Sequence, residues 1–395
     1  MADKAGIIIC GGGIIGLTIA KELLDKGHKN IVILEKEKKL GEHASGRNSG
    51  ILHAGIYYSP DSLKARFCLE GNFLMKDYCR KNNIPILESG KVIVAKNEEE
   101  IPALEELYNR ALKNGAKVEI IDEKKIKTVE PYAKTCRQAL FSHYTAVVDP
   151  SKVLEALERD LISSGKVMIM KGIEFRELIK DSRLRTNKGS IEFDLFINAA
   201  GCYSDKVAHE FGVGYNYKII PFKGTYKKLK KEKSYLVRGN IYPVPDIRNP
   251  FLGVHFTRSI EGTVYIGPTA ITALGRENYG ILSGIDREVF NIICRNITLL
   301  LTDPLFRKTA HSEIKKYIPR FFFEDANSLI ESLQLNDIEY CSKVGIRAQL
   351  VDWGNKNLVM DFVVLKKGNS LHILNAISPG FTSSMAFAKF IANNL

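Results

Sequence analysis

The spacing of the glycines near residue 11 constrains the fold of this chain more than any other feature. The segment Gly11-Gly-Gly-Ile-Ile-Gly16 follows the short apolar run Gly6-Ile-Ile-Ile-Cys10 and precedes apolar residues at helical spacing over 16–26. A second apolar run, Ile31-Val-Ile-Leu34, follows and ends in Glu35. We therefore predict a strand, a glycine turn, a helix and a second strand, which form one βαβ unit of a parallel sheet.

The order of these elements predicts that the unit binds a dinucleotide. Gly11 permits a tight turn, Gly13 lets the backbone approach a pyrophosphate, and Gly16 lets the helix pack closely on the strand. The first helical turn, at Ile14 and Ile15, presents free N–H groups and the positive end of the helix dipole to the phosphates.

An acidic residue and a second strand narrow the choice of cofactor. Glu35, followed by Lys36, stands where a carboxylate accepts hydrogen bonds from ribose hydroxyls, and its charge disfavours the 2′-phosphate of NADP. The later apolar run 193–200 ends in Ala200 and Gly201 and is followed by Asp205. This resembles the second FAD motif of flavoproteins, whose aspartate lies near the ribityl and pyrophosphate groups, so we predict FAD.

The pattern of apolar and polar residues changes at about residue 215. Alternating, Pro-punctuated segments such as Gly262-Thr-Val-Tyr-Ile-Gly267 predict an antiparallel sheet, with a separate helical piece near 286–301. The predicted fold class is therefore α/β, a Rossmann-like FAD-binding domain plus a substrate-binding domain on a mixed or antiparallel sheet. We assign 1–86, 137–214 and 341–395 to the discontinuous FAD-binding domain, and 87–136 and 215–340 to the substrate-binding cap.

The charge balance indicates anionic partners. Lys and Arg number 57 against 45 Asp and Glu, a net charge of +12 that favours acidic substrates, phosphates or an anionic membrane surface. The basic residues are spread along the chain without a nucleic-acid-binding motif, so we expect no nucleic acid partner. The densest run, Lys227 to Lys233, is predicted to be a solvated hairpin or loop, with contact to anionic lipid headgroups as the alternative.

Cysteine usage indicates a reducing environment. The seven cysteines include no C-x-x-C pair, which argues against a disulfide framework or a zinc site, and we predict no metal. Outside the glycine-containing stretch 7–20, no segment approaches the ~20 apolar residues that span a bilayer. We expect a cytoplasmic location, with any membrane association peripheral at the inner face.

One segment resembles a known family. Ser45-Gly-Arg-Asn-Ser-Gly-Ile-Leu-His-Ala-Gly-Ile-Tyr-Tyr58 resembles the FAD-dependent L-2-hydroxyglutarate dehydrogenases and oxidases, a branch of the D-amino-acid-oxidase-like flavoproteins. Further stretches that match in the family's order are Pro221-Phe-Lys-Gly224, Ile241-Tyr-Pro-Val-Pro245, Leu252-Gly-Val-His-Phe-Thr-Arg258, Ile266-Gly-Pro268 and Gly345-Ile-Arg-Ala-Gln349. The resemblance implies a D-amino-acid-oxidase-like fold, noncovalently bound FAD and oxidation of an L-2-hydroxy acid to a 2-oxo acid.

The resemblance also implies where FAD lies. The helix that begins at Gly380 would turn its N–H groups toward the pyrimidine edge of the flavin, where the reduced ring carries negative charge. Covalent attachment through His43 is the alternative to noncovalent binding. The further residues assigned to the cofactor are Ser45, Arg47, Asn48, Ser49, Gly50, Phe175, Phe381 and Thr382.

Two residues are predicted to carry the chemistry. A neutral imidazole suits removal of a hydroxyl proton near neutral pH, and His53 lies where the chain should pass the flavin ring. Arg347, among small and aliphatic neighbours, is predicted to clamp a substrate carboxylate; an ion pair with Asp361 is the alternative. A second carboxylate of a 2-hydroxy dicarboxylate would need another partner. Candidates are Tyr57, Lys223, His255 and Arg258.

Several functional alternatives remain open from the sequence. A substrate such as L-2-hydroxyglutarate is favoured, glycerol 3-phosphate is the runner-up, and amine oxidation or a non-catalytic flavin-binding role are further alternatives. The electron acceptor, such as a quinone or oxygen, and the oligomeric state are not determined by these residues.

Overall fold

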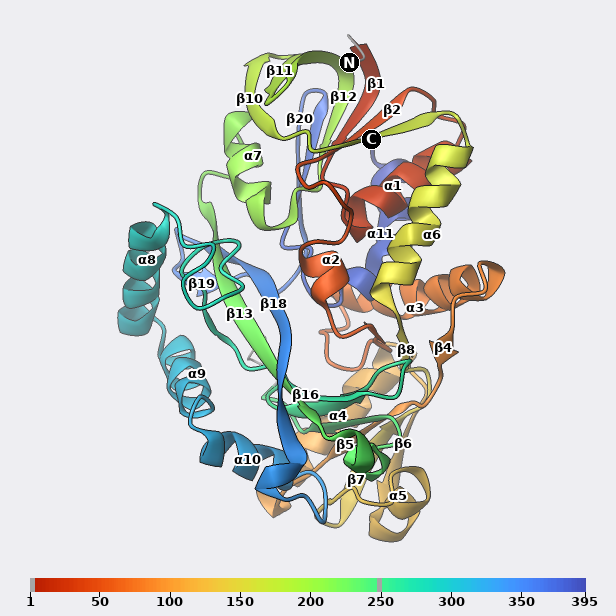
Figure 1. Cartoon of the computed structure of the whole chain (residues 1–395), viewed down its shortest axis with the longest axis vertical. Helices are drawn as coiled ribbons and strands as arrows, with labels where there is room; N and C mark the ends of the chain where they lie inside the picture. Colours follow the sequence, from red (N-terminus) through yellow and green to blue (C-terminus); the bar gives the residue numbers. More distant parts are fainter. Residues whose placement is uncertain (1–3, 247–250) are drawn as a thin grey trace.

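The computed structural model describes residues 4–246 and 251–395, and they form two large sheets and one small one (Figure 1). The core of the first sheet is parallel, and its neighbouring strands come from distant parts of the chain. In spatial order these strands are β21 (Ser370–Leu374), β12 (Gly189–Asn198), β1 (Lys4–Cys10), β2 (Ile31–Glu35) and β9 (Val167–Lys171). The predicted βαβ unit therefore lies at the centre of the sheet, and the C-terminal segment completes it.

The glycine turn joins β1 to α1 (Ile14–Asp25) and tolerates no side chains. Gly11 has φ +114°, and a Cβ there would lie 2.4 Å from the Ala199 carbonyl oxygen. A Cβ on Gly16 would lie 2.0 Å from the Gly11 oxygen. Glycine at these two positions is what lets α1 start directly against the sheet.

Antiparallel strands extend the first sheet at its edge. The hairpin β10 (Phe175–Lys180) and β11 (Arg183–Thr186) pairs with the first half of β12, and β20 (Val363–Lys367) pairs with β21. The short helix α7 (Ser204–Glu210) follows β12 and contacts β10 and β21.

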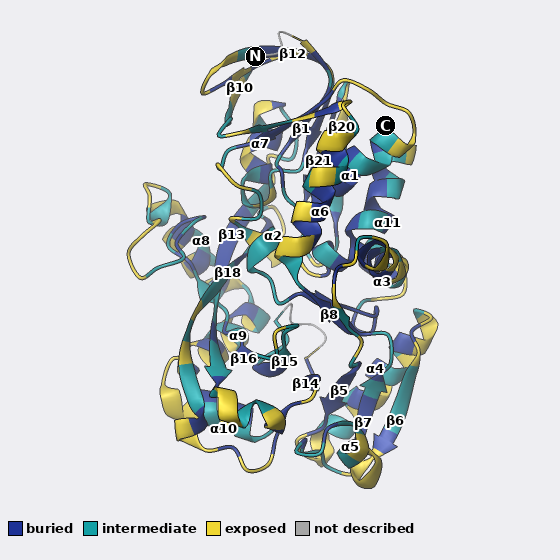
Figure 2. Ribbon diagram, turned by 45° about the vertical axis from the view of Figure 1, so that its right-hand side comes forward, coloured by how far each residue is buried: buried dark blue, intermediate teal, exposed yellow. Residues whose placement is uncertain are grey.

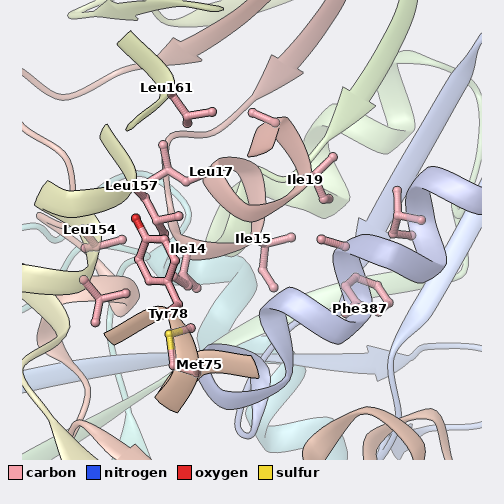
Figure 3. Packing of buried hydrophobic residues seen from close by; sticks show 14 of the residues in the cluster. Ile14, Ile15, Leu17, Ile19, Met75, Tyr78, Leu154, Leu157, Leu161 and Phe387 are labelled. Atoms are coloured by element: carbon pink, nitrogen blue, oxygen red, sulfur yellow. The ribbon is translucent and has the colours of Figure 1, made fainter. Parts of the chain in front are cut away.

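Four helices pack together on the first sheet. They are α1, α3 (Leu63–Lys81), α6 (Pro150–Ser163) and α11 (Gly380–Asn393). Their apolar stripes meet in one core, where Leu17, Leu157 and Phe387 are fully buried (Figure 3). Burial of each such side chain contributes about 1.5–3 kcal/mol. Helix α6 begins after Asp149, whose side chain accepts a hydrogen bond from the Ser151 N–H.

The second sheet is mainly antiparallel, and β14 and β5 form its parallel pair among the described residues. Its central pair is β13 (Tyr217–Leu229) with β18 (Ile338–Asp352). The other strands are β5 (Lys91–Val94), β6 (Val118–Asp122), β7 (Gln138–Ser142), β14 (Asn240–Pro243), β15 (His255–Arg258), β16 (Val264–Gly267), β17 (Ile271–Thr272) and β19 (Asn357–Leu358).

Smaller elements complete the fold. A small sheet of β3 (Ile51–Leu52), β8 (Ala146–Val148) and β4 (Ile86–Leu87) lies between the two large sheets in the fold diagrams (Figures 1 and 2). The helices outside the first sheet are α4 (Ile101–Lys113), α5 (Glu123–Val129), α8 (Val289–Thr302), α9 (Pro304–Lys315) and α10 (Pro319–Asn327). In residues 4–246 and 251–395, no single helix meets the length and apolarity required to cross a membrane; α8 and α9 meet them only as a pair bent by 115°.

The parallel first sheet and the mixed second sheet agree with the predicted fold, while two details differ. β7 and residues 341–352 of β18 belong to the second sheet, although the predicted boundaries assign them to the first domain. The predicted ranges also contain residues 1–3 and 247–250, which lie outside the described residues. The lysine run is the end of β13 and a 3₁₀ turn, where Lys228 pairs with Glu339 and Lys233 with Asp337.

Candidate active site

A cavity of about 1130 Å³ extends from the glycine turn to the β13–β18 pair. Gly11 and Gly13 line one part of it, and His53, His255 and Arg347 line another. Ordinary ligand pockets measure about 300–1,000 Å³. This cavity therefore has room for a dinucleotide together with a small substrate.

The start of α1 presents backbone donors to the cavity. The Ser45 Oγ accepts a hydrogen bond of 2.9 Å from the Ile14 N–H. The N–H groups of Gly13 and Ile15 donate to no described residue. Free N–H groups at a helix N-terminus bind phosphate oxygens. Gly16 lies behind this turn, outside the cavity lining, and acts through close packing.

Glu35 is held in place at the end of β2. Its carboxylate oxygens each accept one hydrogen bond of 2.9 Å, from the N–H groups of Gly12 and Glu37. The side chain lines the cavity, and each oxygen keeps a second lone pair with which to accept a ribose hydroxyl. Lys36 and Phe175, the other predicted residues here, also line the cavity; the Lys36 Nζ lies 2.6 Å from the Glu277 carboxylate.

The segment that carries the family resemblance folds as the short helix α2 (Ala44–Arg47) followed by β3. The Arg47 guanidinium lies 4.1 Å from the centre of the Tyr279 ring, and the Asn48 side chain accepts a hydrogen bond from the Gly50 N–H. Arg47, Asn48 and Ser49 line the cavity; Gly50 does not. Gly50 has φ +76° and lies against the Val148 carbonyl, so its role is in the backbone turn.

His43 lines the same part of the cavity, but other side chains occupy its ring nitrogens. Nδ1 lies 2.8 Å from the Tyr279 hydroxyl, and Nε2 lies 3.0 Å from the Glu37 carboxylate. These contacts support noncovalent binding of a cofactor here, because a covalent bond through either nitrogen would displace one of them.

The start of α11 is connected to the segment that carries His53. The Thr382 Oγ1 accepts a hydrogen bond of 3.0 Å from the His53 N–H and donates one of 3.2 Å to the Ile51 carbonyl. Phe381 and Thr382 line the cavity, whereas Gly380 does not. The helix N-terminus and His53 are therefore positioned together.

The turn after β12 lies at the cavity, but Asp205 does not. Ala200 and Gly201 line the cavity. The Asp205 carboxylate is buried, 2.6 Å from the Arg276 guanidinium, and also accepts a hydrogen bond from the Ile219 N–H. The prediction of a cofactor contact for Asp205 is therefore corrected, since its side chain is saturated by structural partners and lies outside the lining.

His53 faces the cavity from a buried position and is 8% exposed. Its Nδ1 is enclosed by protein without a hydrogen-bond partner among the described residues. Because Nδ1 is enclosed, Nε2 is the nitrogen that can reach a substrate. Burial, with smaller contributions from Lys91 and His255, holds the pKa of His53 well below its usual range. The imidazole is therefore neutral at neutral pH, as a general base requires.

His255 and Tyr57, the other two residues predicted to contact a substrate, also line the cavity. The His255 ring stacks on Tyr242 with 3.8 Å between ring centres, and its Nδ1 lies 2.8 Å from the Gly253 carbonyl. Burial lowers the pKa of His255 to about 3. The ring is thus an uncharged hydrogen-bonding group.

Arg347 faces the cavity without an acidic partner. Its Nε donates to the Gln349 side chain at 3.2 Å, and it forms no ion pair within residues 4–246 and 251–395. Burial lowers the pKa of Arg347 to about 10, so the group stays charged near neutral pH. Asp361, the alternative partner, instead accepts hydrogen bonds from the N–H groups of Leu63 and Lys64.

Two predicted substrate contacts lie elsewhere. The Lys223 Nζ donates to the Asn278 side chain and the Gly280 carbonyl, both at 2.9 Å. The Arg258 guanidinium donates to backbone carbonyls of residues 234 and 237. Neither residue lines the cavity, so both predictions are corrected: these side chains bind loops away from the site.

Sequence reasoning missed two buried lysines. Lys64, near the start of α3, is 3% exposed and lines the cavity; burial and the nearby Arg347 lower its pKa to about 7. Lys91, in β5, is 1% exposed, and its Nζ lies 4.4 Å and 4.7 Å from the ring centres of Tyr57 and Tyr242. The sequence did contain an indication that Lys91 is buried, because this lysine begins the apolar run Lys91-Val-Ile-Val94. Lys64 resembles any helical surface lysine in sequence.

Comparison with known proteins identifies the protein family to which the chain belongs. The family model described as FAD dependent oxidoreductase matches residues 6–394, and the chain belongs to this family. Among solved structures, it is similar to the FAD-bound L-α-glycerophosphate oxidase from Mycoplasma pneumoniae, with TM-score 0.79 and 22% identity over 99% of this chain and 95% of that one. The glycine oxidase from Bacillus cereus superposes with TM-score 0.71 and 18% identity, over 99% and 94%. The predicted fold and the FAD cofactor are thereby confirmed.

Relatives of higher sequence identity are L-2-hydroxyglutarate dehydrogenases. The chain is 37% identical to the mitochondrial L-2-hydroxyglutarate dehydrogenase of Bos taurus, over 98% of this chain and 88% of the relative. It is 38% identical to the L-2-hydroxyglutarate dehydrogenase of Indibacter alkaliphilus, over 96% of each chain. The family resemblance read from residues 45–58 is thus confirmed over nearly the full length.

The residues present fit FAD. The free N–H groups at α1 suit the pyrophosphate, Glu35 suits a ribose, and the cavity continues past Thr382 to the unpartnered His53. A cofactor held along this path would have its adenosine end at β2 and its ring end near the histidine.

Proposed function

We propose that this chain oxidises L-2-hydroxyglutarate to 2-oxoglutarate. The observation that carries the proposal is one cavity whose lining includes the dinucleotide turn, a neutral His53 and an Arg347 that forms no ion pair with a described residue. The activity of the L-2-hydroxyglutarate dehydrogenases that are 37–38% identical over nearly the full chain supports the same substrate.

The chain's residues divide the reaction between them. Bound FAD supplies the two-electron acceptor for the hydrogen on the substrate's C2. The Nε2 of His53 takes the hydroxyl proton, because Nδ1 is enclosed and the ring is uncharged. Arg347 holds the carboxylate next to C2 with two parallel hydrogen bonds, which fixes C2 relative to the histidine.

Lys64 is the partner that we assign to the second carboxylate. It lines the cavity, lies close enough to Arg347 for the guanidinium charge to lower its pKa, and has no ion pair with a described residue. Arg347 and the protonated form of Lys64 place two positive charges at the cavity, and the nearby Asp361 carboxylate partly offsets the charge of Lys64. A dicarboxylate neutralises both, whereas a monocarboxylate leaves one charge buried and unpaired, which is costly.

Turnover with a set of substrates tests the proposal. Purified holoenzyme with an artificial electron acceptor should form 2-oxoglutarate from L-2-hydroxyglutarate, with the D-enantiomer, glycerol 3-phosphate and L-amino acids as comparisons. Turnover of glycerol 3-phosphate or an amino acid in preference to L-2-hydroxyglutarate would replace the proposed substrate.

We also propose an electron acceptor and a cellular location for this enzyme. We propose that a quinone or oxygen reoxidises the enzyme, and reoxidation of the reduced protein by each acceptor in turn distinguishes them. A reducing, cytoplasmic location is supported by the seven cysteines, all of which are free thiols. Fractionation of cells into soluble and membrane pools tests the location.

A further inference from the structure

The outer side of three consecutive helices exposes large apolar residues. α8, α9 and α10 follow one another along one side of the molecule (Figure 1). Phe290, Leu301 and Ile314 are 74%, 72% and 64% exposed. Isolated exposed apolar residues need no explanation, but a group gathered on one surface marks an interaction site.

On α8 the exposed residues form one stripe. They are spaced three or four residues apart and therefore share one side of the helix: Phe290, Ile293, Ile297 and Leu301. The opposite side packs on the second sheet, where Leu299 belongs to one core cluster with Ile220 and Phe222 of β13. The stripe is therefore not part of the fold's own core.

The apolar surface continues beyond α8. At the junction of α9 and α10 four more large apolar residues are exposed: Ile314 on α9, Tyr317 and Ile318 in the connecting turn, and Phe321 on α10. We call these four residues and the four of the α8 stripe the outer apolar face. The loop before α8 adds Ile281 and Leu282, which are 89% and 77% exposed.

Positive charges outnumber negative ones over residues 286–320, which carry most of the outer apolar face. Arg287, Lys308 and Lys315 are exposed and form no ion pair with a described residue. Of the acids in the same region, Glu288 pairs with Arg276 and Glu313 with Lys316, while Asp286 and Asp303 accept backbone hydrogen bonds and form no ion pair with a described residue. A second copy of the chain docked through the same face would bring these unpaired cations together, which disfavours a symmetric dimer. An anionic bilayer complements both the apolar stripe and the cations.

We infer that the outer apolar face docks on an anionic lipid bilayer. The apolar side chains enter the headgroup and upper acyl region, and Arg287, Lys308 and Lys315 contact lipid phosphates. The face belongs to the second sheet's helices and uses no residue of the cavity lining named above. The inference is thus independent of the proposed substrate.

Vesicle sedimentation of the holoprotein tests this inference. Wild-type protein should sediment with phosphatidylcholine vesicles containing about 30 mol% phosphatidylglycerol, and at least tenfold less with the Phe290→Ser/Leu301→Ser double variant. Binding should weaken in pure phosphatidylcholine and at about 1 M salt. Turnover with a soluble electron acceptor should stay unchanged in the double variant.

A matched pair of substitutions serves as the control. Ile162 on α6 and Met168 on β9 are 53% and 50% exposed on another part of the surface, and Ile162→Ser/Met168→Ser should bind vesicles as wild type does. Wild-type protein that stays in the supernatant with anionic vesicles overturns the inference, as does a double variant that still sediments fully. A wild-type dimer that the double variant converts to monomer in sedimentation velocity would assign the face to a second copy instead.

Discussion

His53 combines burial, an enclosed Nδ1 and a neighbouring lysine, and these features together determine its titration. The fully buried Lys91 amine lies among Tyr57, Tyr242 and the two histidines, where its charge disfavours protonation of His53. We regard Lys91 as a positioning residue that helps to keep the base neutral.

The pH dependence of turnover follows from this arrangement. Since the pKa of His53 is held well below 6.5, kcat/KM for L-2-hydroxyglutarate should not fall as the pH decreases through 6.5, and the acid limb should appear at lower pH. Lys91→Met removes a charge that lowers this pKa and should move the acid limb to higher pH. An acid limb at the same pH in both proteins would show that Lys91 does not tune the base.

Lys64 should govern the preference for a dicarboxylate. A charge-assisted hydrogen bond contributes about 1.5–3 kcal/mol, so Lys64→Met should lower kcat/KM for L-2-hydroxyglutarate by about 10–100-fold. For L-2-hydroxybutyrate, which lacks the second carboxylate, we expect a change of less than about threefold.

Lys76 provides the matched control for this substitution. It lies on the same helix and is also 3% exposed, but it pairs with Glu88 and does not line the cavity. Lys76→Met should reduce stability and leave the ratio of the two kcat/KM values unchanged. If Lys64→Met lowers kcat/KM equally for both substrates, Lys64 does not bind the second carboxylate.

At the scale of elements, disruption of the glycine turn should abolish FAD binding. Gly16→Ala puts a Cβ 2.0 Å from the Gly11 oxygen, so α1 must shift from the sheet and the N–H groups at its start must move. We expect purified Gly16→Ala protein to have lost most of its flavin absorbance. Gly27, just after α1, has open space around its Cβ position, so Gly27→Ala should cost only about 1 kcal/mol and retain FAD.

The elements also show what sequence could and could not predict. The βαβ unit was predictable because its strand, glycines and helix are local in sequence, and His53 and Arg347 because they belong to family motifs. Asp205 was mistaken for a cofactor ligand because its partner, Arg276, is 71 residues away. Lys223 and Arg258 were misplaced since the direction of a side chain on a strand depends on register, which the sequence alone left open.

For the whole molecule, buried histidines should make stability depend on pH. Burial lowers the pKa values of His53, His255 and His372, so the unfolded chain binds more protons than the native one below pH 6.5. Glu130 acts oppositely, because burial raises its pKa to about 7. Three groups outweigh one, and the Tm of the holoprotein should therefore fall from pH 6.5 to about 4.5. A Tm that stays constant or rises over this range would contradict the account.

The central claim is that one cavity holds FAD and a dicarboxylic 2-hydroxy acid beside His53. Anaerobic titration of the purified holoprotein with L-2-hydroxyglutarate measures this directly, through the flavin absorbance near ~450 nm. The account predicts complete bleaching by L-2-hydroxyglutarate and much slower bleaching in the His53→Asn protein at the same FAD content. Protein that carries FAD yet keeps its full absorbance with this acid, or a His53→Asn variant that bleaches at the wild-type rate, would contradict it.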